Sequence, residues 1–95
     1  MRIKDLCPDD RPREKMRKLG PRAMSNTDLL AILIGSGTGG KNVTMVAQEL
    51  MALAEGRLTL LGMMPLENLI RQKGIGKVRA ITICAALELG RRAIS

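Results

Sequence analysis

The segment from Leu66 to Leu89 constrains the fold of this chain more than any other part of the sequence. It contains an apolar-spaced stretch, then the turn Gly74-Ile75-Gly76, and then a second apolar-spaced stretch that opens with basic residues. Two helices can reverse direction in so few residues only where the turn tolerates positive φ and close backbone approach, which glycine allows. We therefore predict two helices joined by a tight glycine turn, with Ile75 filling the gap between them.

The start of the second predicted helix favours an anion. The N–H groups of a helix's first turn have no partner within the helix, and the helix dipole attracts negative charge there. The segment resembles the helix-hairpin-helix motif, in which a glycine turn and the following first turn grip nucleic-acid phosphates without reading bases. The candidate DNA-binding residues are Lys73, Gly74, Ile75, Gly76, Lys77, Val78 and Arg79.

The composition predicts an all-α fold. The chain has 95 residues, 45% of them hydrophobic, and no Phe, Trp or Tyr, so a single small core must be built from aliphatic side chains and Met. Leu, Met and Ala favour helix, whereas β-branched and aromatic strand formers are scarce. We expect one domain over residues 1–95, a small bundle of five to six helices with the glycine-turn motif at about 66–89.

The remaining helices are predicted from their end signals. Pro12 suits the first turn of a helix, and Ser25 with Asp28 is a weaker relative of the capping box. Asn42 can cap the clearest amphipathic segment, which Gly56 ends. The predicted elements are a turn-rich entry at 6–12, helices over 12–20, 25–35 and 42–56, a connector at 58–61, a helix opened by Pro65, and a last helix over 77–92.

The net charge of +7 is unevenly distributed. The surplus is +4 over residues 1–22, −2 over residues 23–70 and +5 over residues 71–95. One basic excess therefore centres on the glycine turn, as a phosphate-contacting surface needs. The alternative is a solvated basic face without a ligand.

The glycine-rich loop at residues 35–41 has two interpretations. Leu30, Leu33, Ile34, Gly35 and Gly37 match, in order, Leu69 and the pair Gly74 and Gly76, and in both places an apolar helix follows the glycine turn. This suggests a degenerate second hairpin, similar to the hairpin pair of RuvA domain 2, with Ser36 in the place of Ile75. The sequence GSGTGGK also has Walker spacing, but Asn42 stands where a magnesium-binding Ser or Thr is needed, and the chain is too short for the parallel sheet. We expect no nucleotide binding, with Lys41 as a secondary phosphate contact.

The residues offer little for catalysis. There is no histidine, and no carboxylates recur at a spacing that would build a metal site or an acid–base pair. Asp9 with Asp10 is interpreted as a solvated turn. Cys7 and Cys84 show no metal-ligand spacing, and Cys84 lies in an apolar stretch that would bury it. We expect no catalytic residue, no metal, no cofactor and no enzymatic activity in this chain.

Three blocks, in order, resemble the N-terminal domain of the RadC family. These are DDRPREKMRKLG, AMSNTDLLAILIGSGT and KGIGKVRAITICAALELGRR, which together span most of the chain. The resemblance implies a helical domain with helix-hairpin-helix character, ahead of a C-terminal JAB/MPN-type metallohydrolase domain that carries the family's zinc ligands. The chain ends just after Arg91 and Arg92, where the family passes into a linker, so we expect it to be one domain of a longer DNA-repair-like protein.

Two functions remain open from the sequence. In the first, the chain is a sequence-independent DNA-binding module that grips the backbone of duplex DNA. In the second, it is a protein-interaction or regulatory domain that docks on the metallohydrolase domain or presents its substrate, as the nearly all-apolar stretch from Ile81 to Leu89 favours. Residues 1–10 lack the apolar run of a signal peptide, and no apolar run is long enough to span a bilayer, so we expect a cytoplasmic protein without a membrane partner.

Overall fold

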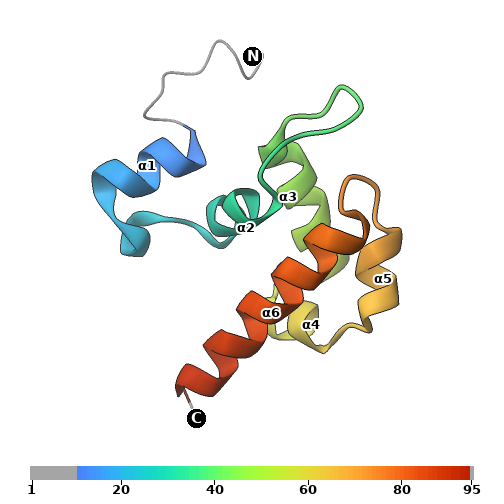
Figure 1. Cartoon of the computed structure of the whole chain (residues 1–95). Coiled ribbons are helices and arrows are strands. Elements are labelled where there is room, and N and C mark those ends of the chain that lie inside the picture. Colours follow the sequence, from blue (N-terminus) through green and yellow to red (C-terminus); the bar gives the residue numbers. More distant parts are fainter. Residues whose placement is uncertain (1–10, 95) are drawn as a thin grey trace.

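The computed structural model describes residues 11–94, which form six α-helices and one short 3-10 helix with no strand among them (Figure 1). This confirms the predicted all-α bundle. The turn-rich entry expected at 6–12 lies largely outside the described residues, as do Cys7 and the Asp9-Asp10 turn. The elements are α1 (Pro12–Leu19), η3 (Pro21–Ala23), α2 (Asn26–Ile34), α3 (Val43–Leu53), α4 (Leu58–Met63), α5 (Leu66–Arg71) and α6 (Gly76–Ile94).

The helix starts follow the predicted end signals. Pro12 is the first residue of α1, and Pro65 is the N-cap of α5. Ser25 and Asp28 form a complete capping box at the start of α2, because each side chain accepts a hydrogen bond from the other residue's N–H, at 3.0 and 3.1 Å. Asn42 caps α3 by accepting from the Met45 N–H at 2.9 Å. These local signals therefore set where the long helices begin.

The predicted connector at 58–61 is wrong, because these residues begin α4. Leu61 is fully buried and anchors this short helix in the core, so tertiary packing provides the stability that a six-residue helix lacks on its own. The preceding helix also ends earlier than predicted, at Leu53. Glu55 and Gly56 then adopt positive φ of 55° and 75°, and the Gly56 N–H returns to the Met51 carbonyl at 2.8 Å.

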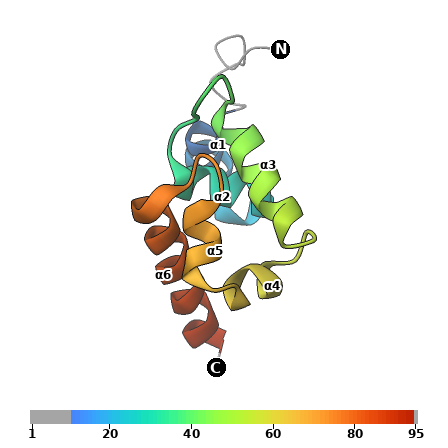
Figure 2. The same ribbon diagram turned by 90° about the vertical axis from the view of Figure 1, so that its right-hand side faces the viewer.

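The core is aliphatic and shared by five helices. Helix α3 contributes one buried face to the core, and α2 packs against α3. Helix α6 packs against both α2 and α5 (Figures 1 and 2). No polar or charged residue is buried within 11–94. The fully buried side chains of largest volume are Leu50, Leu61, Leu69, Ile83 and Val46.

Helix α6 has two environments along its length. Ala80 and Ile83 are fully buried, whereas Ile81 and Leu89 are 50% and 70% exposed. Cys84 is half-buried against the core, so it is less buried than the sequence suggested. The carboxyl-terminal part of α6 extends past the other helices in Figure 1. Within 11–94, no helix is both long and apolar enough to cross a membrane.

Candidate functional site

The turn between α5 and α6 has the geometry that its glycines predict. Gly74 and Gly76 adopt φ of +90° and +67°, and the Ile75 N–H donates to the Gln72 carbonyl at 3.0 Å. Ile75 is only 3% exposed and belongs to the core cluster, which confirms its role as the apolar residue between the helices. Ile75 therefore belongs to the core, and the residue as a whole, backbone included, has almost no exposed surface.

The two lysines of this turn are exposed. Lys73 precedes Gly74, and Lys77 is the second residue of α6. Among the described residues no side chain caps the first turn of α6, in contrast to Ser25 on α2 and Asn42 on α3. Uncapped N–H groups, the positive end of a 19-residue helix and two ammonium groups therefore lie together at the surface. Val78, beside them, is 76% exposed.

Arg79 lies in the same first turns of α6 but has a different environment. Its Nη1 donates to the Gly74 carbonyl and its Nη2 donates to the Ser36 hydroxyl, both at 2.6 Å. The side chain is therefore half-buried between the turn and a loop 43 residues earlier in the chain. The structure thus separates Arg79 from Lys73 and Lys77, which the sequence placed in one group.

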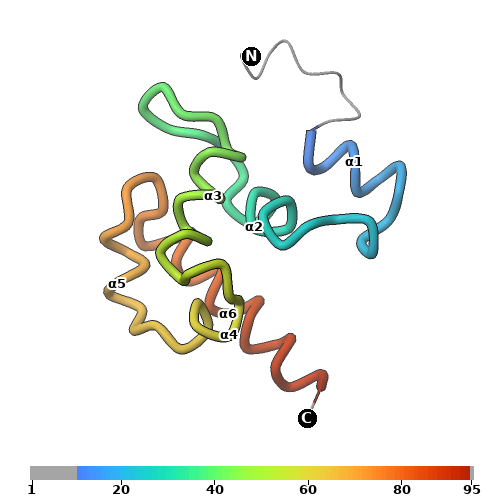
Figure 3. Tube along the Cα trace, turned by 180° about the vertical axis from the view of Figure 1, so that it is seen from behind, coloured from blue at the N-terminus to red at the C-terminus, as the bar shows by residue number. Residues whose placement is uncertain are grey.

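The loop at 35–41 lies beside the turn at 72–76 (Figure 3). Thr38 and Lys41 close it by two backbone hydrogen bonds of 2.9 and 2.8 Å. Gly37 has no room for a side chain, because a Cβ there would overlap the Lys41 carbonyl. A Cβ on Gly74 would lie 2.9 Å from Thr38 Cγ2, so glycine is required where the two loops touch.

Lys41, the predicted secondary phosphate contact, is half-buried and paired. Its Nζ lies 2.8 Å from Glu49 Oε2 on α3. The Asn42 cap also satisfies part of the first turn of α3. The loop at 35–41 therefore has glycines like the later turn, but its lysine is paired and the helix after it is capped by a side chain.

Charges elsewhere are partly neutralised by neighbours. Hydrogen bonds from Arg91 and then Arg92 lower the pKa of Glu88 to about 2, so this carboxylate balances part of the positive charge at the far end of α6. Burial raises the pKa of Asp28, but hydrogen bonds from Lys15 and Ser25 outweigh it and hold that pKa below its usual 3.8. The basic excess of residues 71–95 is consequently concentrated near the glycine turn.

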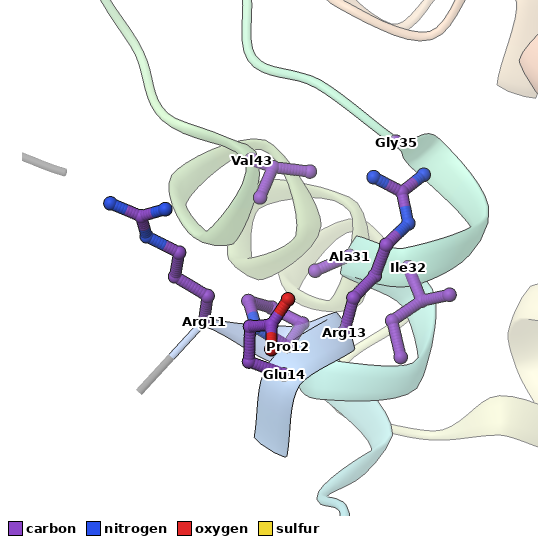
Figure 4. A pocket seen from close by; sticks show the side chains of 8 residues that line it. All are labelled: Arg11, Pro12, Arg13, Glu14, Ala31, Ile32, Gly35 and Val43. Carbon is purple, nitrogen blue, oxygen red and sulfur yellow. The ribbon is translucent and has the colours of Figure 1, made fainter. Parts of the chain in front are cut away.

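A second surface feature is a pocket of about 280 Å³ between α1 and the adjoining ends of α2 and α3. Figure 4 shows Arg11 and Arg13 on opposite sides of it, with Glu14 between them and Val43 above. The acidic side chain among the two basic ones makes this pocket less electropositive than the glycine turn. Within residues 11–94, no three His, Cys, Asp or Glu side chains are placed to hold a metal ion.

Comparison with known proteins assigns the family. The family model described as "UPF0758 N-terminal" matches residues 3–81, which cover all elements through the first turns of α6. The chain belongs to the UPF0758 N-terminal family. A UPF0758 protein of Flavobacterium johnsoniae is 47% identical over 90 residues, covering 95% of this chain and 39% of the relative. That of Porphyromonas gingivalis is 43% identical over 93 residues, covering 97% and 41%.

The UPF0758 relatives are longer than this chain. A third, from Caldanaerobacter subterraneus subsp. tengcongensis, is 42% identical over 92 residues, which are 97% of this chain and 39% of the relative. The chain thus spans about two fifths of the length of these relatives. No solved structure matches it significantly.

Sequence reasoning missed two residues of this region. Ser36 receives a hydrogen bond from Arg79, and Thr38 contacts Gly74 closely. The parallel order of glycines in the two loops was the available signal, because it predicts that the loops occupy related positions. No local pattern predicts the hydrogen bond from Arg79 to the earlier loop, because it joins residues 43 positions apart.

Proposed function

We propose that this chain is a sequence-independent DNA-binding module that grips the phosphate backbone at the turn 72–76. The carrying observation is that exposed Lys73 and Lys77 flank two positive-φ glycines at the start of α6, which no side chain within residues 11–94 caps. Backbone N–H groups and the helix dipole bind one phosphate, and the two ammonium groups attract and anchor the neighbouring backbone. This arrangement supports the helix-hairpin-helix interpretation of the motif.

The chemistry of the surface favours duplex DNA over single strands. Base stacking on a protein needs aromatic or similar planar faces, and this chain has no Phe, Trp or Tyr.

The affinity for DNA is expected to depend on salt. Two to four neutralised phosphates give a slope of about −2 to −4 when the logarithm of the binding constant is plotted against the logarithm of the salt concentration, with almost no discrimination between sequences. The family match is compatible with the RadC resemblance, and the greater length of the relatives supports the proposal that this module is one part of a RadC-like protein.

Fluorescence anisotropy tests this function with the label on the DNA, since the protein has no Trp or Tyr. A duplex is titrated at several salt concentrations with the wild type and with Lys73→Glu/Lys77→Glu. We expect a slope of about −2 to −4 and a loss of at least about tenfold in the variant. Arg22→Glu/Arg57→Glu is the control, because it makes the same charge change at exposed positions of other elements. A slope near zero, or an equal loss in the control, would refute the proposal.

A second candidate function rests on the outer face of α6. Val78, Ile81 and Leu89 are 76%, 50% and 70% exposed, and their spacing places them on one face of the helix. Such a stripe suits a protein partner, for which we propose the remaining part of the longer RadC-like protein. Binding of this chain to that part, lost in Ile81→Glu, would support it. Unchanged binding in the variant, or none in the wild type, would reject it.

A further inference from the structure

A hydrogen bond and a steric contact join the loop 35–41 to the turn 72–76 and the start of α6. The Arg79 guanidinium donates to Ser36 on one side and to the Gly74 carbonyl on the other, at 2.6 Å each. The missing side chain of Gly74 lets Thr38 approach, because a Cβ on Gly74 would lie 2.9 Å from Thr38 Cγ2. The two loops come from helix pairs far apart in sequence, yet they meet at one end of the bundle (Figures 2 and 3).

Arg79 is the polar link in this contact. Within residues 11–94, the Arg79–Ser36 bond is the hydrogen bond that joins side chains of the two loop regions, and the other contacts between them are steric. A guanidinium has N–H groups that point in fixed, diverging directions, so it can hold two acceptors at a set separation. A lysine ammonium is a point charge that cannot reproduce this planar geometry.

We infer that Arg79 is a positioning residue that locks the two glycine loops into one rigid unit, rather than a group that contacts the ligand. This inference rests on the proposed function, because it specifies how the phosphate-binding turn is held in its binding geometry. Arg79 fixes the Gly74 carbonyl, and with it the peptide plane between Gly74 and Ile75 that leads into the start of α6. Ser36 provides the second support, from α2 and its loop.

The test compares Arg79→Lys with Lys77→Gln in the anisotropy titration. Arg79→Lys keeps the charge but loses the two-acceptor geometry. We expect it to weaken DNA binding about tenfold, the scale of losing hydrogen bonds to a charged group, with the salt slope unchanged. Lys77→Gln removes a phosphate contact and is expected to reduce the magnitude of the slope by about one. Arg79→Ala is measured as well. If Arg79→Lys retains its affinity for DNA and Arg79→Ala reduces the magnitude of the salt slope by about one, Arg79 is a phosphate contact and the inference is wrong.

Ser36→Ala provides the second variant. Because Ser36 and Arg79 act through one hydrogen bond, the loss in the double variant is expected to be smaller than the product of the two single losses. Multiplicative losses would overturn the link between the loops. The helical circular dichroism of each variant shows whether the fold is retained.

Amide hydrogen exchange separates this inference from the proposed function. If the wild type does not bind DNA, the proposed function fails, but the link can still be measured in the free protein. Arg79→Lys is then expected to speed exchange in both loops together, at 35–41 and 72–76, by at least about tenfold relative to α3. Faster exchange in the turn alone would overturn the inference.

Discussion

The loop 35–41 and the turn 72–76 are two versions of one architecture. Each contains a glycine at φ near +90°, Gly35 or Gly74, and leads into a helix longer than the one before it. They differ in what surrounds the glycines, because Lys41 is paired with Glu49 and Asn42 caps α3, whereas Lys73 and Lys77 are exposed and α6 is not capped by a described side chain. The glycines alone allow the chain to turn between two helices. In the proposed function, the exposed lysines beside the second turn are what allow it to bind an anion.

The largest expected effect concerns the residue between the glycines. Ile75 is 3% exposed in the core, whereas its counterpart Ser36 is exposed. Ile75→Ala is expected to lower the free energy of unfolding by about 2–5 kcal/mol, because it leaves a cavity between α5 and α6. Ser36→Ala loses one hydrogen bond to Arg79 and is expected to cost about 1–2 kcal/mol. Urea denaturation followed by circular dichroism measures the free energy of unfolding of both variants. Similar losses would contradict the placement of Ile75 in the core and of Ser36 at the surface.

The second effect concerns the contact between the loops. Gly74→Ala adds strain at φ of +90° and a Cβ 2.9 Å from Thr38 and 3.1 Å from Val46. Gly76→Ala is the matched control, since it has φ of +67° but no atom within 4 Å of its Cβ position. We expect Gly74→Ala to lower the free energy of unfolding by about 1–3 kcal/mol more than the control, the usual cost of overpacking. Equal losses would show that the loops are not in tight contact.

The third effect concerns Lys41, which can be made unpaired like the lysines of the turn 72–76. Glu49→Gln removes the ion pair of Lys41. Because both side chains are partly exposed, this pair contributes about 1 kcal/mol or less to stability. We expect DNA affinity to rise up to about threefold and the salt slope to steepen by up to about one. Glu67→Gln makes the same charge change on α5 and serves as the control. A gain that is no larger than in the control would show that Lys41 does not reach the ligand.

The smallest effect concerns α2, the helix that leads into the loop 35–41. The pKa of Asp28 is lowered in the folded chain, so its carboxylate stabilises the fold above the usual value of 3.8, and this contribution is lost as the pH falls through the lowered pKa. Asp28→Asn removes the titrating group. Thermal unfolding at pH 6 and pH 3 is expected to show a larger loss of stability in the wild type than in the variant. Parallel losses would contradict the role of the capping box.

The sequence predicted most of the fold because its helix ends are marked by local chemistry. The capping residues and the glycine turn act within a few residues, and each was found where its pattern indicated. Helix α4 was missed because its stability comes from the burial of Leu61, which is a tertiary effect. The Arg79–Ser36 and Lys41–Glu49 contacts were missed for the same kind of reason, because no local spacing encodes which side chains the fold brings together.

The most direct test of this comparison is to titrate ¹⁵N-labelled protein with an unlabelled DNA duplex and follow the backbone amide signals by NMR. We expect the largest shifts at residues 73–79, smaller ones at 35–41, and almost none on α4. Shifts centred on the outer face of α6, equal shifts in the two loops, or no shifts at low salt would contradict the claim that the turn at 72–76 is the phosphate-binding site.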